Sequence, residues 1–180
     1  MSETVVKPKV ILSVKVDGKE VYLKEDDLLT KWFNRDVLFY ITRLNLPLKT
    51  TTGSEYQHST HSTTIRLTDV VGPTKIAIGT DATEPSPTDY ELKSKYMENT
   101  TLDIKVYQET DNYVIADISA SFSIPEDITI YEFGLYNKFM FPVTGIAEYL
   151  VARDVVPEGI PVTAGQVLTI TYRFIIGTYP

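Results

Sequence analysis

Cysteine is absent from this chain of 180 residues. Its absence excludes disulfide bonds, thiolate metal sites and a cysteine nucleophile. Long apolar runs are also missing, and none approaches the roughly 20 residues that a membrane-spanning helix needs. Residues 1–9 are polar and contain no apolar leader segment. We therefore expect a chain that is soluble when made and has no membrane partner.

Clusters of basic residues are missing as well. The chain has 17 lysines and arginines against 24 aspartates and glutamates, which gives a formal net charge of −7. Nucleic-acid-binding domains usually present a basic patch, so we expect no nucleic-acid partner. The apolar fraction of 43% is enough to build a core, and disorder is not expected at this composition.

The signature motifs of common enzymes do not occur. There is no Gly-x-Ser-x-Gly elbow, no Gly-x-Gly-x-x-Gly loop and no Walker lysine. His58 and His61 are the only histidines. They lie in a stretch rich in serine and threonine without a third ligand nearby, so an exposed loop is favoured over a metal site.

Carboxylates offer the one remaining route to catalysis. Glycoside cleavage uses two carboxyl groups about 5 to 10 Å apart in a cleft. Four acidic residues in the second half of the chain could supply such a pair, namely Asp117, Glu126, Asp127 and Glu132. A β protein with 24 acidic residues offers such pairs by chance. We therefore predict no enzymatic activity and no cofactor.

Strict alternation of apolar and polar residues begins early in the chain. Val10, Leu12, Val14 and Val16 alternate with less apolar neighbours, and Asp17-Gly18 follows. Asp-Gly between two alternating runs is a strong signal for a two-residue type I′ turn. With residues 21–23 as the returning strand, the pattern predicts a β-hairpin over residues 10–23.

The second half of the chain contains short alternating runs at regular spacing. They predict strands at residues 74–80, 101–109, 113–124, 128–135, 146–154 and 167–176. No helical pattern separates them, which argues against a parallel βαβ sheet. The fold class predicted is mainly β, an antiparallel β-sandwich of the jelly-roll or immunoglobulin-like kind.

Between the hairpin and these strands the periodicity changes. Apolar spacings of three and four over residues 24–44 predict one or two short amphipathic helices. Residues 49–64 are polar and predict a long loop or a loosely paired hairpin. We therefore divide the chain into residues 1–48, an N-terminal arm with hairpin and helix, and residues 49–180, the sandwich.

Aromatic residues provide candidate interface positions. The chain has 12 tyrosines, and tyrosine combines a large apolar area with a polar tip that suits protein interfaces and sugar platforms. Plain packing in half-buried sheet positions is the alternative. The residues predicted to lie at an interface are Trp32, Phe33, Phe39, Tyr40, Tyr56, Tyr107 and Tyr113.

Three segments stand out in the chain, IAIGTDATEPSPTDYEL at 76–92, ITIYEFGLYN at 128–137 and YLVARDVVPEGIPVTAGQVLTITYRF at 149–174. In this order they resemble segments of structural proteins of phage and archaeal-virus particles. The helical pattern around residues 28–33 also resembles the N-terminal helix of that family. The resemblance implies a tail, collar, fibre-attachment or head-decoration protein of the virion, with no catalytic residues to carry over.

The resemblance also implies partners, namely copies of the chain itself and other virion proteins. A carbohydrate- or receptor-binding module that takes a host glycan or receptor is the alternative function. Gly79, Glu132, Gly134 and Arg153 are expected to be structural, and Glu132 is expected to cap backbone amides or to pair with Arg153. If the N-terminal arm drives assembly, removal of residues 1–24 should abolish assembly and leave the sandwich folded.

Overall fold

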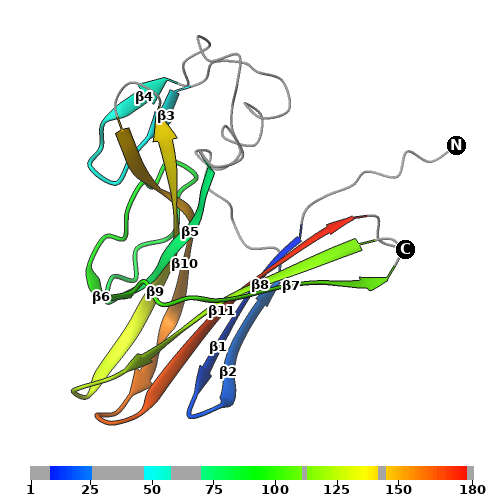
Figure 1. The fold of residues 1–180 in the computed structure, drawn as a ribbon. Coiled ribbons are helices and arrows are strands. Elements are labelled where there is room, and N and C mark those ends of the chain that lie inside the picture. The colour runs from blue at the N-terminus through cyan, green and yellow to red at the C-terminus, as the bar shows by residue number, and fades with distance from the viewer. Residues whose placement is uncertain (1–8, 26–46, 58–69, 111–112, 142–144, 178–180) are drawn as a thin grey trace, which may run out of the picture. The chain divides into compact units, whose positions relative to one another are not determined.

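The computed structural model describes residues 9–25, 47–57, 70–110, 113–141 and 145–177. Every regular element in these ranges is a β-strand (Figure 1). No helix that is long and apolar enough to cross a membrane occurs in them. The mainly β class predicted from the sequence is therefore confirmed for the described part of the chain.

The strands form two larger antiparallel sheets and one small one. The five-stranded sheet has the order β2-β1-β11-β8-β7 and comprises β1 (Lys9–Val16), β2 (Lys19–Glu25), β7 (Asp103–Thr110), β8 (Tyr113–Ser123) and β11 (Val167–Gly177). The four-stranded sheet has the order β10-β9-β5-β6 and comprises β5 (Val70–Gly79), β6 (Lys95–Asn99), β9 (Ile128–Phe141) and β10 (Gly145–Val162). The small sheet pairs β3 (Pro47–Lys49) with β4 (Glu55–Gln57).

The chain forms two compact units, each assembled from separate segments. The first draws on Met1–Asp27, Asn99–Thr129 and Ile160–Pro180, and it holds the five-stranded sheet. The second draws on Leu28–Glu98 and Ile130–Gly159, and it holds β3 to β6 with most of β9 and β10. Two antiparallel sheets are the parts that a β-sandwich needs, whereas the jelly-roll or immunoglobulin-like topology stays a prediction.

The predicted N-terminal hairpin is present as β1 and β2. Asp17 and Gly18 both have positive φ, 49° and 78°, which is the requirement of a type I′ turn. The turn joins Val16 to its cross-strand partner Lys19. Asp17 also fixes the neighbouring loop, because its Oδ1 accepts a hydrogen bond of 3.0 Å from the backbone N–H of Val167.

The hairpin is not the separate arm that the sequence suggested. β1 pairs with β11 along its whole length, from Lys9 opposite Ile175 to Val16 opposite Leu168. β1 is therefore an interior strand of the five-stranded sheet. The expected division at residues 48 and 49 stays a prediction, since residues 26–46 next to it lie outside the described part of the chain.

One face of the five-stranded sheet carries its apolar core. Because side chains alternate along a strand, every second residue of β1, β11 and β8 points to this apolar face. The register places Leu12 opposite Tyr172 and Tyr172 opposite Ile118. All three residues are buried, as are residues two or four positions along the same strands, Val10, Val14, Leu168, Ile170, Ala120 and Phe122.

All six strands predicted in the second half of the chain occur, as β5, β7, β8, β9, β10 and β11. β6 was not expected. For the polar stretch at 49–64 the sequence left a long loop or a loosely paired hairpin open. Its described part, residues 49–57, forms a hairpin in which β3 pairs with β4. The helices predicted within residues 24–44 fall largely on 26–46, outside the described residues, while Lys24 and Glu25 belong to β2.

Candidate functional site

The seven predicted interface residues are only partly placed. Trp32, Phe33, Phe39 and Tyr40 lie outside the described residues. The other three belong to strands, Tyr56 to β4, Tyr107 to β7 and Tyr113 to β8. Tyr107 and Tyr113 belong to the five-stranded sheet, whereas Tyr56 belongs to the small sheet. The three tyrosines therefore do not share one sheet surface.

The four predicted structural residues come together in the second unit. Glu132 and Gly134 lie on β9, where they oppose Gly79 and Ala77 of β5. Arg153 lies on β10 and contacts Glu132. Gly79, Glu132, Gly134 and Arg153 thus belong to one buried cluster, although three separate segments of the sequence supply them.

Arg153 is the centre of that cluster and is 1% exposed. Its Nε donates to Glu132 Oε2 over 2.9 Å, and its Nη2 lies 2.8 Å from the same oxygen. Its Nη1 donates to the carbonyl of Thr83 over 3.0 Å and to Asp89 Oδ2 over 3.2 Å. A buried charge is tolerated only when it is paired and hydrogen-bonded, and this guanidinium meets that condition.

Glu132 makes both contacts that the sequence offered as alternatives. Besides the pair with Arg153, its Oε1 accepts a hydrogen bond of 2.6 Å from the N–H of Ser94, and its Oε2 accepts one of 3.0 Å from the N–H of Lys93. Both oxygens are thereby committed to binding the segment before β6. This carboxylate therefore holds the segment before β6 against the sheet.

Glycine is required where this segment lies against the sheet. A Cβ on Gly79 would lie 2.5 Å from the backbone carbonyl of Ser94, and one on Gly134 would lie 2.8 Å from Leu92. Beside them the Tyr136 hydroxyl accepts a hydrogen bond of 3.0 Å from the N–H of Leu92. Burial raises the pKa of Tyr136 above its usual value, so this hydroxyl stays protonated.

The ammonium group of Lys75 lies beside Tyr136 and pairs with two carboxylates. Lys75 of β5 bridges Glu148 over 2.7 Å and Glu98 over 3.0 Å, and its ammonium lies 4.8 Å from the centre of the Tyr136 ring. Burial opposes the charged form, but the hydrogen bonds to Glu148 and Glu98 outweigh it and raise the pKa of Lys75. The lysine is fully engaged and is unsuited to act as a base.

Three of the four carboxylates considered for glycoside cleavage, Asp117, Asp127 and Glu132, form hydrogen bonds within the chain. Asp117 of β8 forms two hydrogen bonds with Arg173 of β11, of 2.7 and 2.8 Å. Asp127 accepts a hydrogen bond of 2.9 Å from the N–H of Ala164, and Glu132 lies in the cluster around Arg153. Within the described ranges, no group of three or more histidine or acidic side chains could hold a metal ion.

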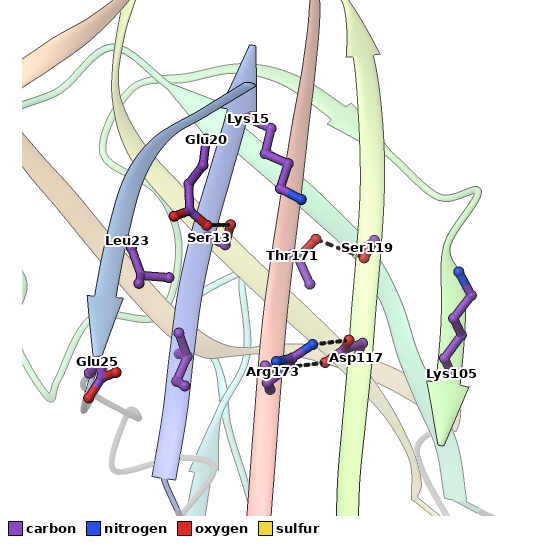
Figure 2. Close-up of a pocket in the computed structure, with 11 residues that line it drawn as sticks. Ser13, Lys15, Glu20, Leu23, Glu25, Lys105, Asp117, Ser119, Thr171 and Arg173 are labelled. Carbon is purple, nitrogen blue, oxygen red and sulfur yellow. Dashed lines mark hydrogen bonds and ion pairs between the residues drawn. The ribbon is translucent and has the colours of Figure 1, made fainter. Parts of the chain in front are cut away.

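A trough of about 490 Å³ lies on the polar face of the five-stranded sheet, the face opposite its apolar core (Figure 2). Three small hydroxyl side chains, Ser13, Ser119 and Thr171, line the trough together with longer charged side chains. Ser119 and Thr171 are hydrogen-bonded to each other over 2.9 Å, and Ser13 donates to Glu20 over 3.0 Å. The charged residues that line it balance, with Lys15, Lys105 and Arg173 against Glu20, Glu25 and Asp117.

The trough does not match the tyrosine platform expected for sugar binding. No aromatic side chain is among the residues that line it. Among the described residues, Tyr136, Tyr149 and Tyr172 are buried, and Tyr22, Tyr90, Tyr96 and Tyr131 are half-buried. Tyr136, Tyr149 and Tyr172 thus pack in the core, while an interface role for the half-buried tyrosines stays a prediction.

The two outer strands of the five-stranded sheet expose apolar side chains. On β2, Val21 is 49% and Leu23 is 51% exposed; on β7, Ile104 is 49% and Val106 is 68% exposed. The interior strands bury most of their apolar residues. Sequence reasoning could not find these positions, because only the order of strands in the sheet shows which of them are edges.

No protein-family model, curated protein sequence or solved structure matches the chain.

Proposed function

We propose that the chain is a non-enzymatic structural protein that assembles with other protein chains. The observation that supports this proposal is the exposure of apolar residues on both outer strands of the five-stranded sheet. An outer strand carries unpaired backbone N–H and C=O groups and is a template for another strand. Adding a strand there satisfies those groups and covers the apolar side chains.

The engaged state of the buried charged groups agrees with this proposal. Glu132 and Arg153 hold a segment against the four-stranded sheet, and Lys75 is bound between two carboxylates. Catalytic acids and bases need a free oxygen or nitrogen near the substrate. Glu132, Arg153 and Lys75 are therefore assigned to packing in this proposal.

The setting proposed is a viral particle. The motifs at 76–92, 128–137 and 149–174 support it through their resemblance to virion structural proteins, and the β-sandwich topology of the jelly-roll or immunoglobulin-like kind belongs to the same proposal. The partners are then other virion proteins and further copies of the chain, and the location is the virion. Mass spectrometry of particles purified from the virus that encodes the chain should find it in repeated copies. Its absence from such particles would contradict this setting.

The surface itself is tested by lysine substitution. A variant with Val21→Lys, Leu23→Lys, Ile104→Lys and Val106→Lys blocks both outer strands, because charged edges resist strand addition. Mass photometry should show the unmodified chain as an assembly, alone or with its particle proteins, and the variant as a monomer. The control is Val167→Lys on the interior strand β11, where an apolar residue is also exposed. Assembly that survives the fourfold variant would refute the role of these strands.

A further inference from the structure

We infer that β7 pairs antiparallel with β7 of a second copy of the chain, about a two-fold axis at Ile104. The inference rests on the proposed function and names its partner and register. It joins two five-stranded sheets into one continuous sheet of ten strands. Two-fold dimers are the commonest closed assemblies of identical chains, and the same patch serves both copies.

β7 is the outer strand better suited to accept a partner. Its register with β8 is regular from Asp103 opposite Ser119 to Gln108 opposite Val114, and it shifts only beyond Gln108. β2, by contrast, has a register shift in its middle, where Val14 opposes Tyr22 and Lys15 opposes Glu20. Such a bulge twists a strand and obstructs continued pairing, so β7 presents the longer straight edge.

The sequence at this edge is complementary to itself when read backwards. Residues 102–106 read Leu-Asp-Ile-Lys-Val, which is an apolar, acidic, apolar, basic, apolar order. Antiparallel pairing centred on Ile104 places Asp103 of each copy opposite Lys105 of the other copy. It also places Leu102 opposite Val106, and Ile104 opposite its own equivalent. Opposite charges and apolar pairs directly across two strands are the stabilising combinations.

The paired residues also lie on matching faces of the sheet. Asp103 and Lys105 oppose Ser119 and Asp117, residues of the polar face. Ile104 opposes the buried Ile118 on the apolar face. Because side chains alternate along β7 from Asp103, the Asp103–Lys105 pairs lie on the polar face and the Ile104 pair lies on the apolar face.

The charged pair can change partners at little cost. Lys105 Nζ lies 2.8 Å from Asp103 of its own strand, and both side chains are largely exposed. Exposed ion pairs contribute little to stability, so little is lost when Lys105 moves to Asp103 of the second copy. The two exchanged pairs replace the two internal ones, and the apolar side chains Ile104 and Val106 become covered.

Charge exchange within β7 tests this register. Asp103→Lys makes both charges of the edge positive, and Lys105→Asp makes both negative, so either change alone places like charges opposite each other in a homodimer. Sedimentation should show each single variant with a dimer dissociation constant raised roughly tenfold or more. The double variant Asp103→Lys/Lys105→Asp should restore the dimer, as should mixing the two single variants. Lys15→Asp, on the interior strand β1, is the control and should leave the dimer unchanged.

The outcomes separate this inference from the proposed function. Loss in the single variants with recovery in the double variant and the mixture supports pairing through β7. The inference is overturned if the unmodified chain sediments as a monomer even at about 100 times the concentration used for the other runs. It is also overturned if both single variants leave the dimer intact. In those cases the proposed function stands if the chain still occurs in purified particles, and fails with its absence from them.

Discussion

Arg153 and Arg173 show how the same residue type serves different purposes at two depths. Arg153 is 1% exposed and bound to Glu132 and Asp89, whereas the Arg173 side chain is 42% exposed and pairs with Asp117. Removing one partner of a buried pair leaves an uncompensated charge. An exposed pair has no such penalty.

We predict that Arg153→Met lowers the free energy of unfolding by about 3 to 5 kcal/mol, because Glu132 would remain buried without the Arg153 cation and Asp89 would keep only its pair with Lys93. Glu132→Ala should destabilise the chain for the same reason. Arg173→Met, the matched control, should cost about 1 kcal/mol or less. Urea denaturation gives the free energy of unfolding of all three variants, and thermal unfolding gives their melting temperatures. Both are followed by far-UV circular dichroism. An unchanged melting temperature in Glu132→Ala would show that the cluster does not stabilise the fold.

Gly79 gives a second prediction at the scale of a residue. Gly79→Ala would bring a methyl group to 2.5 Å from both the Ser94 carbonyl and Glu132 Oε1, and crowding of this kind typically costs about 1 to 3 kcal/mol. Gly72→Ala is the control, since nothing lies within 4 Å of its added Cβ. Thermal unfolding of both variants should show a lower melting temperature for Gly79→Ala alone. Equal melting temperatures would contradict the close packing of the segment before β6.

At the scale of elements, the position of β1 reverses an expectation about the N-terminus. Removal of residues 1–24 was expected to spare the sandwich. β1 lies between β2 and β11, and its residues Val10, Leu12 and Val14 are buried. Truncation would therefore remove a core strand and leave the edge of β11 unpaired.

We predict that deletion of residues 1–25 destabilises or unfolds the first unit, because it removes β1 and β2 from the five-stranded sheet. Circular dichroism and thermal unfolding check this truncation. A folded chain with native melting temperature after removal of residues 1–25 would show that β1 is a dispensable arm after all.

Strand existence was predictable from the sequence, and strand order was not. The alternation of apolar and polar residues over 113–124 identifies β8, because successive side chains of a strand point to opposite faces and this pattern is local to the strand. The neighbours of β8 depend on contacts with β7 and β11, and the partner on β11 begins 44 positions after the end of β8. Nothing local in the sequence sets such a pairing.

The same reason explains the outcome for the sites. The contact of Glu132 with Arg153 could be proposed because both belong to recognisable motifs. The trough could not, because Ser119 and Thr171 meet only through the register of β8 with β11. The exposed Ile104 and Val106 look like core residues in the sequence, and only their place on an outer strand distinguishes them.

At the scale of the whole molecule, the chain is an acidic, mainly β protein whose exposed apolar side chains include pairs on both outer strands of one sheet. Copies that join through β7 would cover one of those edges by closed symmetry. The other edge, β2, carries Lys19, Glu20, Lys24 and Glu25 and a bulge, features with which proteins limit unwanted pairing.

Disulfide trapping tests the pairing of copies most directly, because the chain contains no cysteine of its own. Ile104→Cys places one thiol at the proposed two-fold axis, where Cα atoms of paired antiparallel residues lie about 4.5 to 5.5 Å apart, within the range of a disulfide. Under mild oxidation, non-reducing electrophoresis should show a covalent dimer for Ile104→Cys and only monomer for Val167→Cys on the interior strand. A monomer for Ile104→Cys, or equal cross-linking of both variants, would contradict assembly through β7.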